Sequence, residues 1–244
     1  MSMRVSFGFQ PVLVLLCILG TGMGALLPSQ VHAFEFRIAA GIGKHVAPNG
    51  QEQDAGSRPV PVHFAQPHRE LKRKSGTVLA RRWAMTRARV QAEADWLRSC
   101  EKGACRDWRA ATWRKLVSRV EAVPRAVQPA LVQEIVNGNI RYLRDAATDD
   151  HWANPLSTLL RGAGDCDDHV LLKRAVLTAA GYRETDMRLL ILETASGAGH
   201  MALEVDAVTI LVLDNRYRSP RTDRSLAGDR VAAIATDRGY FSVR

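Results

Sequence analysis

The spacing of hydrophobic residues divides this chain into a helical stretch and a later strand-rich stretch. From residue 78 onward, apolar positions recur at steps of three and four, the period of an amphipathic helix. Helices are predicted over residues 78–100, 108–123, 129–142 and 166–182. Pro124 ends the second of these, and Gly181 stands where a helix commonly closes with a left-handed glycine. Residues 145–161 lack the period and are expected to form a polar connection.

The period changes after the fourth helix. Three short runs, 187–193, 200–205 and 208–213, are apolar and rich in β-forming residues, and they are predicted to be strands. The C-terminal residues 231–243 offer one more. Helices followed by an antiparallel sheet, with a helix that begins at Cys166 between them, predict an α+β fold.

The N-terminal residues have the features of an export signal. Arg4 precedes an apolar run over residues 11–20 that is too short to span a bilayer, and Val31-His32-Ala33 fits a small-x-small cleavage site. These features predict a cleaved signal peptide and export; the alternative is an uncleaved N-terminal anchor. The predicted organisation is a signal peptide (1–33), a flexible N-terminal arm (34–76) and one folded domain (77–244).

The formal net charge of the chain is +9, which limits the classes of partner. Such basicity suits nucleic acid, an anionic membrane or an acidic protein. The chain has no RRM, zinc-finger or homeodomain pattern, and export removes it from nucleic acid, so a nucleic-acid partner is not expected. Its arginines are spread along the helical segments, where they are expected to form solvated faces.

Three cysteines follow the predicted cleavage site. Cys100 and Cys105 are close enough in sequence to form a disulfide in an oxidising compartment, although spacing alone does not establish the geometry. Cys166 then remains alone. An odd cysteine in an exported protein is a reactive thiol or an intermolecular link.

The sequence around Cys166 suits a thiol nucleophile. Gly162 and Gly164 allow a tight turn into the helix, and a helix N-terminus favours a thiolate through its free N–H groups. His200 can accept the thiol proton and return it to a leaving amine. The alternative for each residue is a structural role, and only their occurrence together favours catalysis. An oxyanion hole would use the Cys166 N–H and a second donor that the sequence does not identify.

The orienting acid depends on the register of the hairpin that follows. A two-residue turn at Asp206-Ala207 would place Asp214 on the face opposite to His200. A three-residue connection or a bulge would place it on the same face, directly across or diagonal. We therefore predict Asp214 with an odd-length connection, and Asn215 is the reserve candidate.

Three carboxylates surround the cysteine and oppose its ionisation. Asp165, Asp167 and Asp168 would raise the pKa of a thiol beside them, unless they are simple helix N-terminal charges. A bound Ca²⁺ would neutralise them and take their oxygens as ligands. Zn²⁺ is less suitable, since only Cys166 and His169 offer softer ligands nearby.

Several short motifs carry a resemblance to a known family. They are Trp152-Ala153-Asn154-Pro155, Gly164-Asp165-Cys166-Asp167-Asp168, Ala179-Ala180-Gly181-Tyr182, Gly199-His200-Met201-Ala202-Leu203 and Val212-Leu213-Asp214-Asn215. Over residues 83–215 the chain resembles the bacterial transglutaminase-like cysteine proteinases, which include LapG-like periplasmic proteases of surface adhesins. The resemblance implies a papain/transglutaminase-like fold, with a helical N-terminal part and a catalytic cysteine at a helix N-terminus packed on an antiparallel sheet.

The resemblance also implies a site and partners. Cys166, His200 and Asp214 match the catalytic triad, and Asp165, Asp167 and the nearby Asp168 match the calcium-binding acids. Family proteases cleave an adhesin at a dialanine site in the periplasm and are held by an inner-membrane receptor that senses cyclic-di-GMP.

The chain departs from the family pattern in three ways. Asp167 replaces a usual glutamate, His169 replaces a usual aromatic residue, and the C-terminal region is shorter and divergent. The expected function is a periplasmic, calcium-dependent cysteine endopeptidase that acts on a surface or secreted protein such as a large adhesin. The alternatives are a same-fold acyl transferase and a non-enzymatic calcium-binding interaction module.

Overall fold

The computed structural model describes residues 71–102, 105–146, 150–222 and 228–243. The predicted signal peptide and nearly all of the predicted arm lie outside these ranges. Within them, no helix is both long and apolar enough to cross a membrane.

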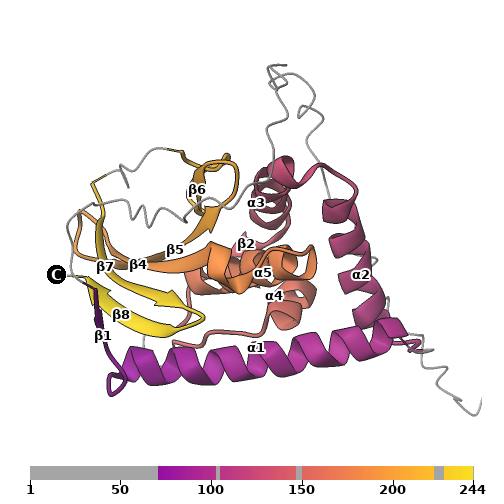
Figure 1. Ribbon diagram of the computed structural model, residues 1–244, viewed down its shortest axis with the longest axis horizontal. Helices are drawn as coiled ribbons and strands as arrows, with labels where there is room; N and C mark the ends of the chain where they lie inside the picture. Colours follow the sequence, from indigo (N-terminus) through magenta and orange to yellow (C-terminus); the bar gives the residue numbers. More distant parts are fainter. Residues whose placement is uncertain (1–70, 103–104, 147–149, 223–227, 244) are drawn as a thin grey trace, which may run out of the picture. The chain divides into compact units, whose positions relative to one another are not determined.

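The described part of the chain is built on a six-stranded sheet in the order β1-β8-β7-β4-β5-β6, in which all neighbours are antiparallel (Figure 1). The strands are β1 (Leu71–Arg73), β4 (Met187–Glu193), β5 (Gly199–Asp206), β6 (Ile210–Leu213), β7 (Arg230–Thr236) and β8 (Gly239–Val243). A separate parallel pair joins β2 (Arg141–Tyr142) to β3 (Ala163–Gly164), directly before Cys166.

Five α-helices accompany the sheet within the residues that the structure describes. They are α1 (Val78–Lys102), α2 (Trp108–Glu121), α3 (Gln128–Asn139), α4 (Pro155–Arg161) and α5 (Cys166–Ala179). The central helix is α5, which contacts β5, α3 and α4. The core between helices and sheet includes Trp83, Leu116, Ile135, Leu172, Leu177 and Leu203. The predicted α+β fold is therefore confirmed.

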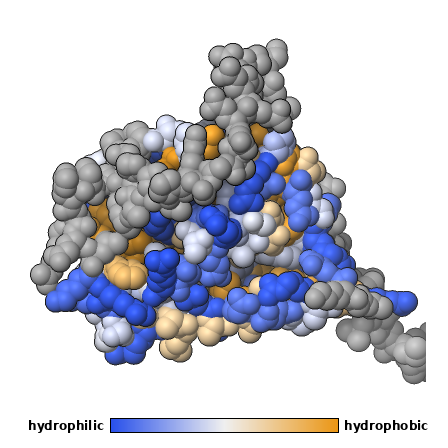
Figure 2. Space-filling view, viewed as in Figure 1, coloured by the Kyte–Doolittle hydropathy of each residue, from blue (hydrophilic) through white to orange (hydrophobic). Residues whose placement is uncertain are grey.

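The helix α1 runs along the edge of this core. The indole Nε1 of its Trp83 donates to the carbonyl oxygen of Thr236 at 2.9 Å, which fastens α1 to the end of β7. Arg81 and Arg98 on the same helix are exposed. Along the lower edge of Figure 2, where Figure 1 places α1, hydrophilic residues alternate with paler, more hydrophobic ones. At its far end, Cys100 forms a disulfide with Cys105.

The structure corrects the prediction of a polar connection over residues 145–161. Residues Pro155–Arg161 form α4, since proline suits the first turn of a helix and Gly162 closes it in a left-handed conformation with φ 62°. The backbone N–H of Leu156 is capped from a distance by Glu93 of α1 at 2.9 Å. The segment is only seven residues long, too short for its apolar period to be recognised.

Smaller differences occur at element ends. The helix predicted over 129–142 ends at Asn139, and Tyr142 lies exposed on β2 instead. The C-terminal region holds two strands, β7 and β8, joined at Gly239, whose φ of 130° favours glycine. Residues Leu71–Arg73, inside the range expected for the arm, pair with β8 as an edge strand.

Candidate active site

Cys166 is the first residue of α5 and enters it from β3. Asp165 is the extended residue that precedes the helix, with φ −95° and ψ −159°. Gly164 before it has no room for a side chain, because a Cβ there would lie 2.5 Å from Oδ2 and 2.6 Å from Cβ of Asp168. The turn into α5 therefore needs a glycine for close packing against the first turn of the helix.

The hairpin of β5 and β6 has the odd-length connection that the sequence predicts. Asp206 pairs with Ile210, which leaves residues 207–209 as a three-residue connection. Leu203 pairs with Leu213, so the residue after the strand, Asp214, reaches the face of β5 that carries His200, diagonal to it. The prediction of this register is confirmed.

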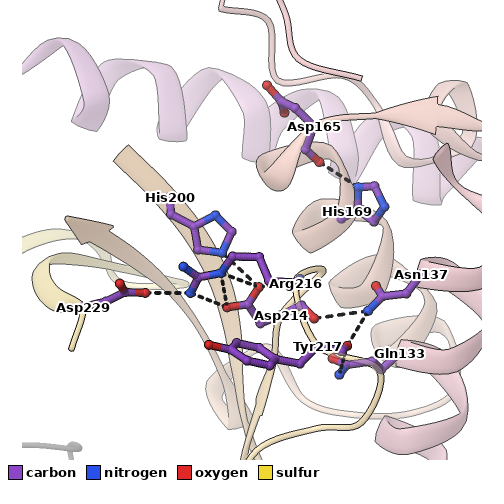
Figure 3. A network of polar contacts seen from close by, with 9 residues as sticks. All are labelled: Gln133, Asn137, Asp165, His169, His200, Asp214, Arg216, Tyr217 and Asp229. Atoms are coloured by element: carbon purple, nitrogen blue, oxygen red, sulfur yellow. Dashed lines mark hydrogen bonds and ion pairs between the residues drawn. The ribbon is translucent and has the colours of Figure 1, made fainter. Parts of the chain in front are cut away.

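His200 and Asp214 are hydrogen-bonded to one another. Nε2 of His200 lies 3.0 Å from Oδ1 of Asp214, and their side chains are 8% and 3% exposed (Figure 3). Burial opposes ionisation of Asp214, but hydrogen bonds from His200 and Arg216 outweigh it and hold its pKa well below the usual range. An ionised Asp214 accepts from Nε2–H, which leaves Nδ1 of His200 as the nitrogen available to a thiol.

The thiol of Cys166 lies beside β5. The backbone N–H groups of Met201 and Asp167 interact with it and favour the thiolate, and Met201 directly follows His200 in the strand. Burial, followed by the charges of Asp167 and Asp165, nevertheless raises the pKa of Cys166 to about 12. The conflict that the sequence predicts between this thiol and its acidic neighbours is therefore present in the metal-free arrangement.

The three acids around Cys166 converge. Asp165, Asp167 and Asp168 are buried, and one carboxylate oxygen from each lies within 4.8 Å of the others. Burial, a hydrogen bond to Asp165 and the charges of Asp165 and Asp168 raise the pKa of Asp167 to about 10. Burial and its acidic neighbours therefore oppose the ionisation of Asp167.

The individual acids are not equally free to bind a cation. Oδ1 of Asp165 and Oδ1 of Asp167 are buried without a hydrogen-bond partner among the described residues. Asp168 instead accepts from the backbone N–H of Ala153 at 2.8 Å and from Arg161 at 2.7 Å. Ca²⁺ prefers oxygen ligands, and the two unpartnered carboxylate oxygens fit it. Asp165 and Asp167 are therefore the main candidate ligands, and Asp168 lies beside them with its oxygens already hydrogen-bonded.

His169 takes no part in this cluster. Its Nδ1 lies 2.8 Å from the carbonyl oxygen of Asp165, and its Nε2 lies 3.2 Å from that of Ile140. Both ring nitrogens are therefore engaged by backbone oxygens, which agrees with the sequence-based preference for calcium over zinc.

The comparisons with known proteins agree with this geometry. The family model of the bacterial transglutaminase-like cysteine proteinases (BTLCP, Peptidase_C93) matches residues 87–222, more than half of the chain. The chain belongs to this family. A search of the curated proteins found no match.

Solved structures of similar fold include LapG of Legionella pneumophila. Its calcium-bound form is 21% identical, with a TM-score of 0.50 over 63% of this chain and 87% of LapG. Its EGTA-treated form is 20% identical, with a TM-score of 0.50 over 64% of this chain and 86% of LapG. This similarity supports the transglutaminase-like fold, and family membership supports a cysteine protease.

The family motif at residues 152–155 positions the site from outside. The carbonyl oxygen of Trp152 accepts from Arg89 of α1 at 2.8 Å, and the N–H of Ala153 donates to Asp168. Trp152 also packs near Trp83, with ring centroids 6.4 Å apart. The motif therefore connects α1 to the first turn of α5.

The sequence reasoning missed the residues that hold the turn after β6. Asn137 of α3 donates to the carbonyl oxygens of Asp214 and Tyr217, at 3.1 and 2.9 Å, and Gln133 also donates to Tyr217 at 3.0 Å (Figure 3). Two amides four residues apart on an apolar helix, Gln133 buried and Asn137 half-buried, are a signal for such a contact, since amides removed from water need partners. Asn215, the reserve acid-site candidate, makes no hydrogen bond to His200 among the contacts of the described residues.

Proposed function

We propose that this chain is a periplasmic, calcium-dependent cysteine endopeptidase that cleaves a surface or secreted protein such as a large adhesin. The observation that carries the proposal is the hydrogen bond between His200 and Asp214. His200 lies on β5, and the next residue of that strand, Met201, directs its N–H to the Cys166 thiol. Family membership supports the protease chemistry. The signal peptide predicted over residues 1–33 supports export.

The proposed reaction begins with Cys166. Its sulfur forms a bond to the peptide carbonyl carbon while Nδ1 of His200 accepts the thiol proton. His200 then gives this proton to the leaving amine, and water hydrolyses the resulting thioester with His200 as the base. Asp214 holds Nε2–H throughout and stabilises the imidazolium. The Cys166 N–H, at the start of α5, is the proposed oxyanion donor.

The proposed role of calcium is to offset the negative charge beside the Cys166 thiol. A Ca²⁺ held by Asp165 and Asp167, next to Asp168, would supply positive charge where two carboxylates now raise the pKa of Cys166. Asp165 and Asp167 would then no longer oppose the thiolate, and α5 would favour it. One of the similar LapG structures is calcium-bound and another is EGTA-treated, which accords with this role.

The substrate and the regulatory partner follow from the family alone. We extend to this chain an adhesin-type substrate and an inner-membrane receptor that sequesters the enzyme. The test compares the N-termini of surface proteins from cells that produce the wild-type chain or Cys166→Ser. New N-termini confined to the wild type support the proposal. Identical N-termini in both samples contradict it, and new isopeptide crosslinks in their place would indicate an acyl transferase.

A further inference from the structure

Arg216 lies between two buried carboxylates from different parts of the chain (Figure 3). Its Nη2 is 2.7 Å from Oδ2 of Asp214 and 2.6 Å from Oδ2 of Asp229. Its Nε lies 3.1 and 3.2 Å from the two oxygens of Asp214. The side chains of Asp214 and Asp229 are 3% and 4% exposed, whereas that of Arg216 is 33% exposed.

These contacts leave the Asp214 carboxylate with a single orientation. Oδ1 accepts from His200 and also from the backbone N–H of Arg216 at 2.9 Å. Oδ2 is held by the guanidinium, so rotation of the carboxylate would break several charge-assisted hydrogen bonds together. Because His200 meets only Oδ1, the fork of Arg216 determines where that oxygen lies.

Asp229 prevents Arg216 from cancelling the charge that His200 needs. A guanidinium paired with Asp214 alone would make a neutral pair, which attracts an imidazolium weakly. With Asp229 as a second carboxylate, the three side chains carry a net charge of −1, the same as a lone aspartate. Asp229 also holds the guanidinium in place, because it accepts from the same Nη2 that contacts Asp214.

We propose that Arg216 is a positioning residue, held by Asp229, that fixes the Asp214 carboxylate toward His200. This inference rests on the proposed function. It extends the site to the residue before β7, outside the matched range of 87–222. The divergent C-terminal region would thus contribute to the catalytic machinery.

The test uses Arg216→Gln, Arg216→Lys and Asp229→Asn, with kcat and KM measured on a peptide that the wild type cleaves. The matched control is Glu193→Gln, which removes the exposed partner of Arg230, the neighbour of Asp229. A misplacement on the order of 1 Å costs about 100-fold in rate, so Arg216→Gln should lower kcat by about that factor with little change in KM. Arg216→Lys should restore part of the loss, and Asp229→Asn should lower kcat by roughly 10-fold.

A second readout needs no substrate. In a Cys166→Ser background at alkaline pH, the ¹⁵N shifts of His200 should report the Nε2–H tautomer, and Arg216→Gln or Asp229→Asn should give a mixture of tautomers. The inference would be overturned if Arg216→Gln and Asp229→Asn both kept the wild-type kcat and KM and the wild-type tautomer of His200. An inactive wild type would count against the proposed function, while the His200 shifts would still decide the role of Arg216. Arg216 is one-third exposed, so in Asp229→Asn water can solvate the part of its guanidinium that loses the carboxylate. If Arg216→Gln does not fold, Asp229→Asn therefore still tests the role of Arg216.

Discussion

Nε2 of His200 lies 3.0 Å from Oδ1 of Asp214, and a three-residue hairpin connection makes this contact possible. With one residue fewer between β5 and β6, Asp214 would lie on the opposite face of the hairpin. Asn137 of α3 then holds the carbonyl oxygen of Asp214 at 3.1 Å, so a helix and a strand register together place the acid.

The role of Asp214 can be tested by Asp214→Asn, which preserves its shape and removes its charge. An amide in this position favours the wrong tautomer of His200, so kcat should fall by up to about 10⁴-fold with KM nearly unchanged. Steady-state kinetics would measure this, with Asp206→Asn at the end of β5 as the control from the same hairpin. Wild-type kcat in Asp214→Asn would exclude the residue from the reaction.

Much of this site could be predicted from residue types and strand parity. Cys166 follows a glycine turn at the predicted start of a helix, which marks it as a candidate nucleophile. Because side chains alternate between the two faces of a strand, the length of the connection between β5 and β6 decides on which face Asp214 lies. The strand over Met187–Glu193 was predicted to the residue, because its apolar run is bounded on both sides.

Other parts depend on contacts that a linear pattern does not carry. The helix α4 is seven residues long and receives a cap from Glu93, 63 residues earlier in the chain. Arg216 and Asp229 are 13 residues apart, and no periodic pattern links them. They meet because Asp229 directly precedes β7, which pairs with β4 in the sheet. Neither the Glu93 cap nor the Arg216–Asp229 pair leaves a pattern in the sequence around it.

Gly164 should tolerate no side chain. Gly164→Ala would place a Cβ within 2.6 Å of two Asp168 atoms, and relief of this clash should cost about 1–3 kcal/mol of unfolding free energy. Gly138→Ala is the matched control, since it lies within α3 with no atom within 4 Å of the added Cβ, and it should stabilise by up to about 1 kcal/mol. Urea unfolding measures both; equal stabilities would refute the packing argument.

Lys173 should make stability depend on pH in the alkaline range. It is fully buried, its Nζ has no hydrogen-bond partner among the described residues, and burial lowers its pKa to about 7 despite the charge of Asp214. Between pH 7 and its unfolded pKa of about 10.4, the unfolded chain binds more protons, so stability rises with pH.

A Lys173→Met variant isolates this effect because methionine fills similar space without a charge. The variant should be more stable than the wild type at pH 7, and the difference should narrow by up to about 1.4 kcal/mol per pH unit toward pH 10. Chemical unfolding at several pH values gives the difference. A constant difference across this range would show that folding does not lower the pKa of Lys173.

Calcium should stabilise the folded chain through the acids beside Cys166. At a free concentration about 100 times Kd, binding adds about 2.7 kcal/mol, and the melting temperature should rise accordingly. Asp165→Asn and Asp167→Asn should each abolish most of this rise, whereas Asp95→Asn on the exposed face of α1 should retain it. A calcium response that survives in both site variants would place the ion elsewhere.

The central claim is that Cys166 is a nucleophile whose reactivity depends on His200 and on calcium. The most direct measurement is the rate at which iodoacetamide alkylates Cys166 near neutral pH, in calcium and in EGTA, for the wild type and for His200→Ala. Fast alkylation only in the wild type with calcium is the predicted result. No alkylation of the wild type in either condition would contradict the claim and favour a non-enzymatic calcium-binding module.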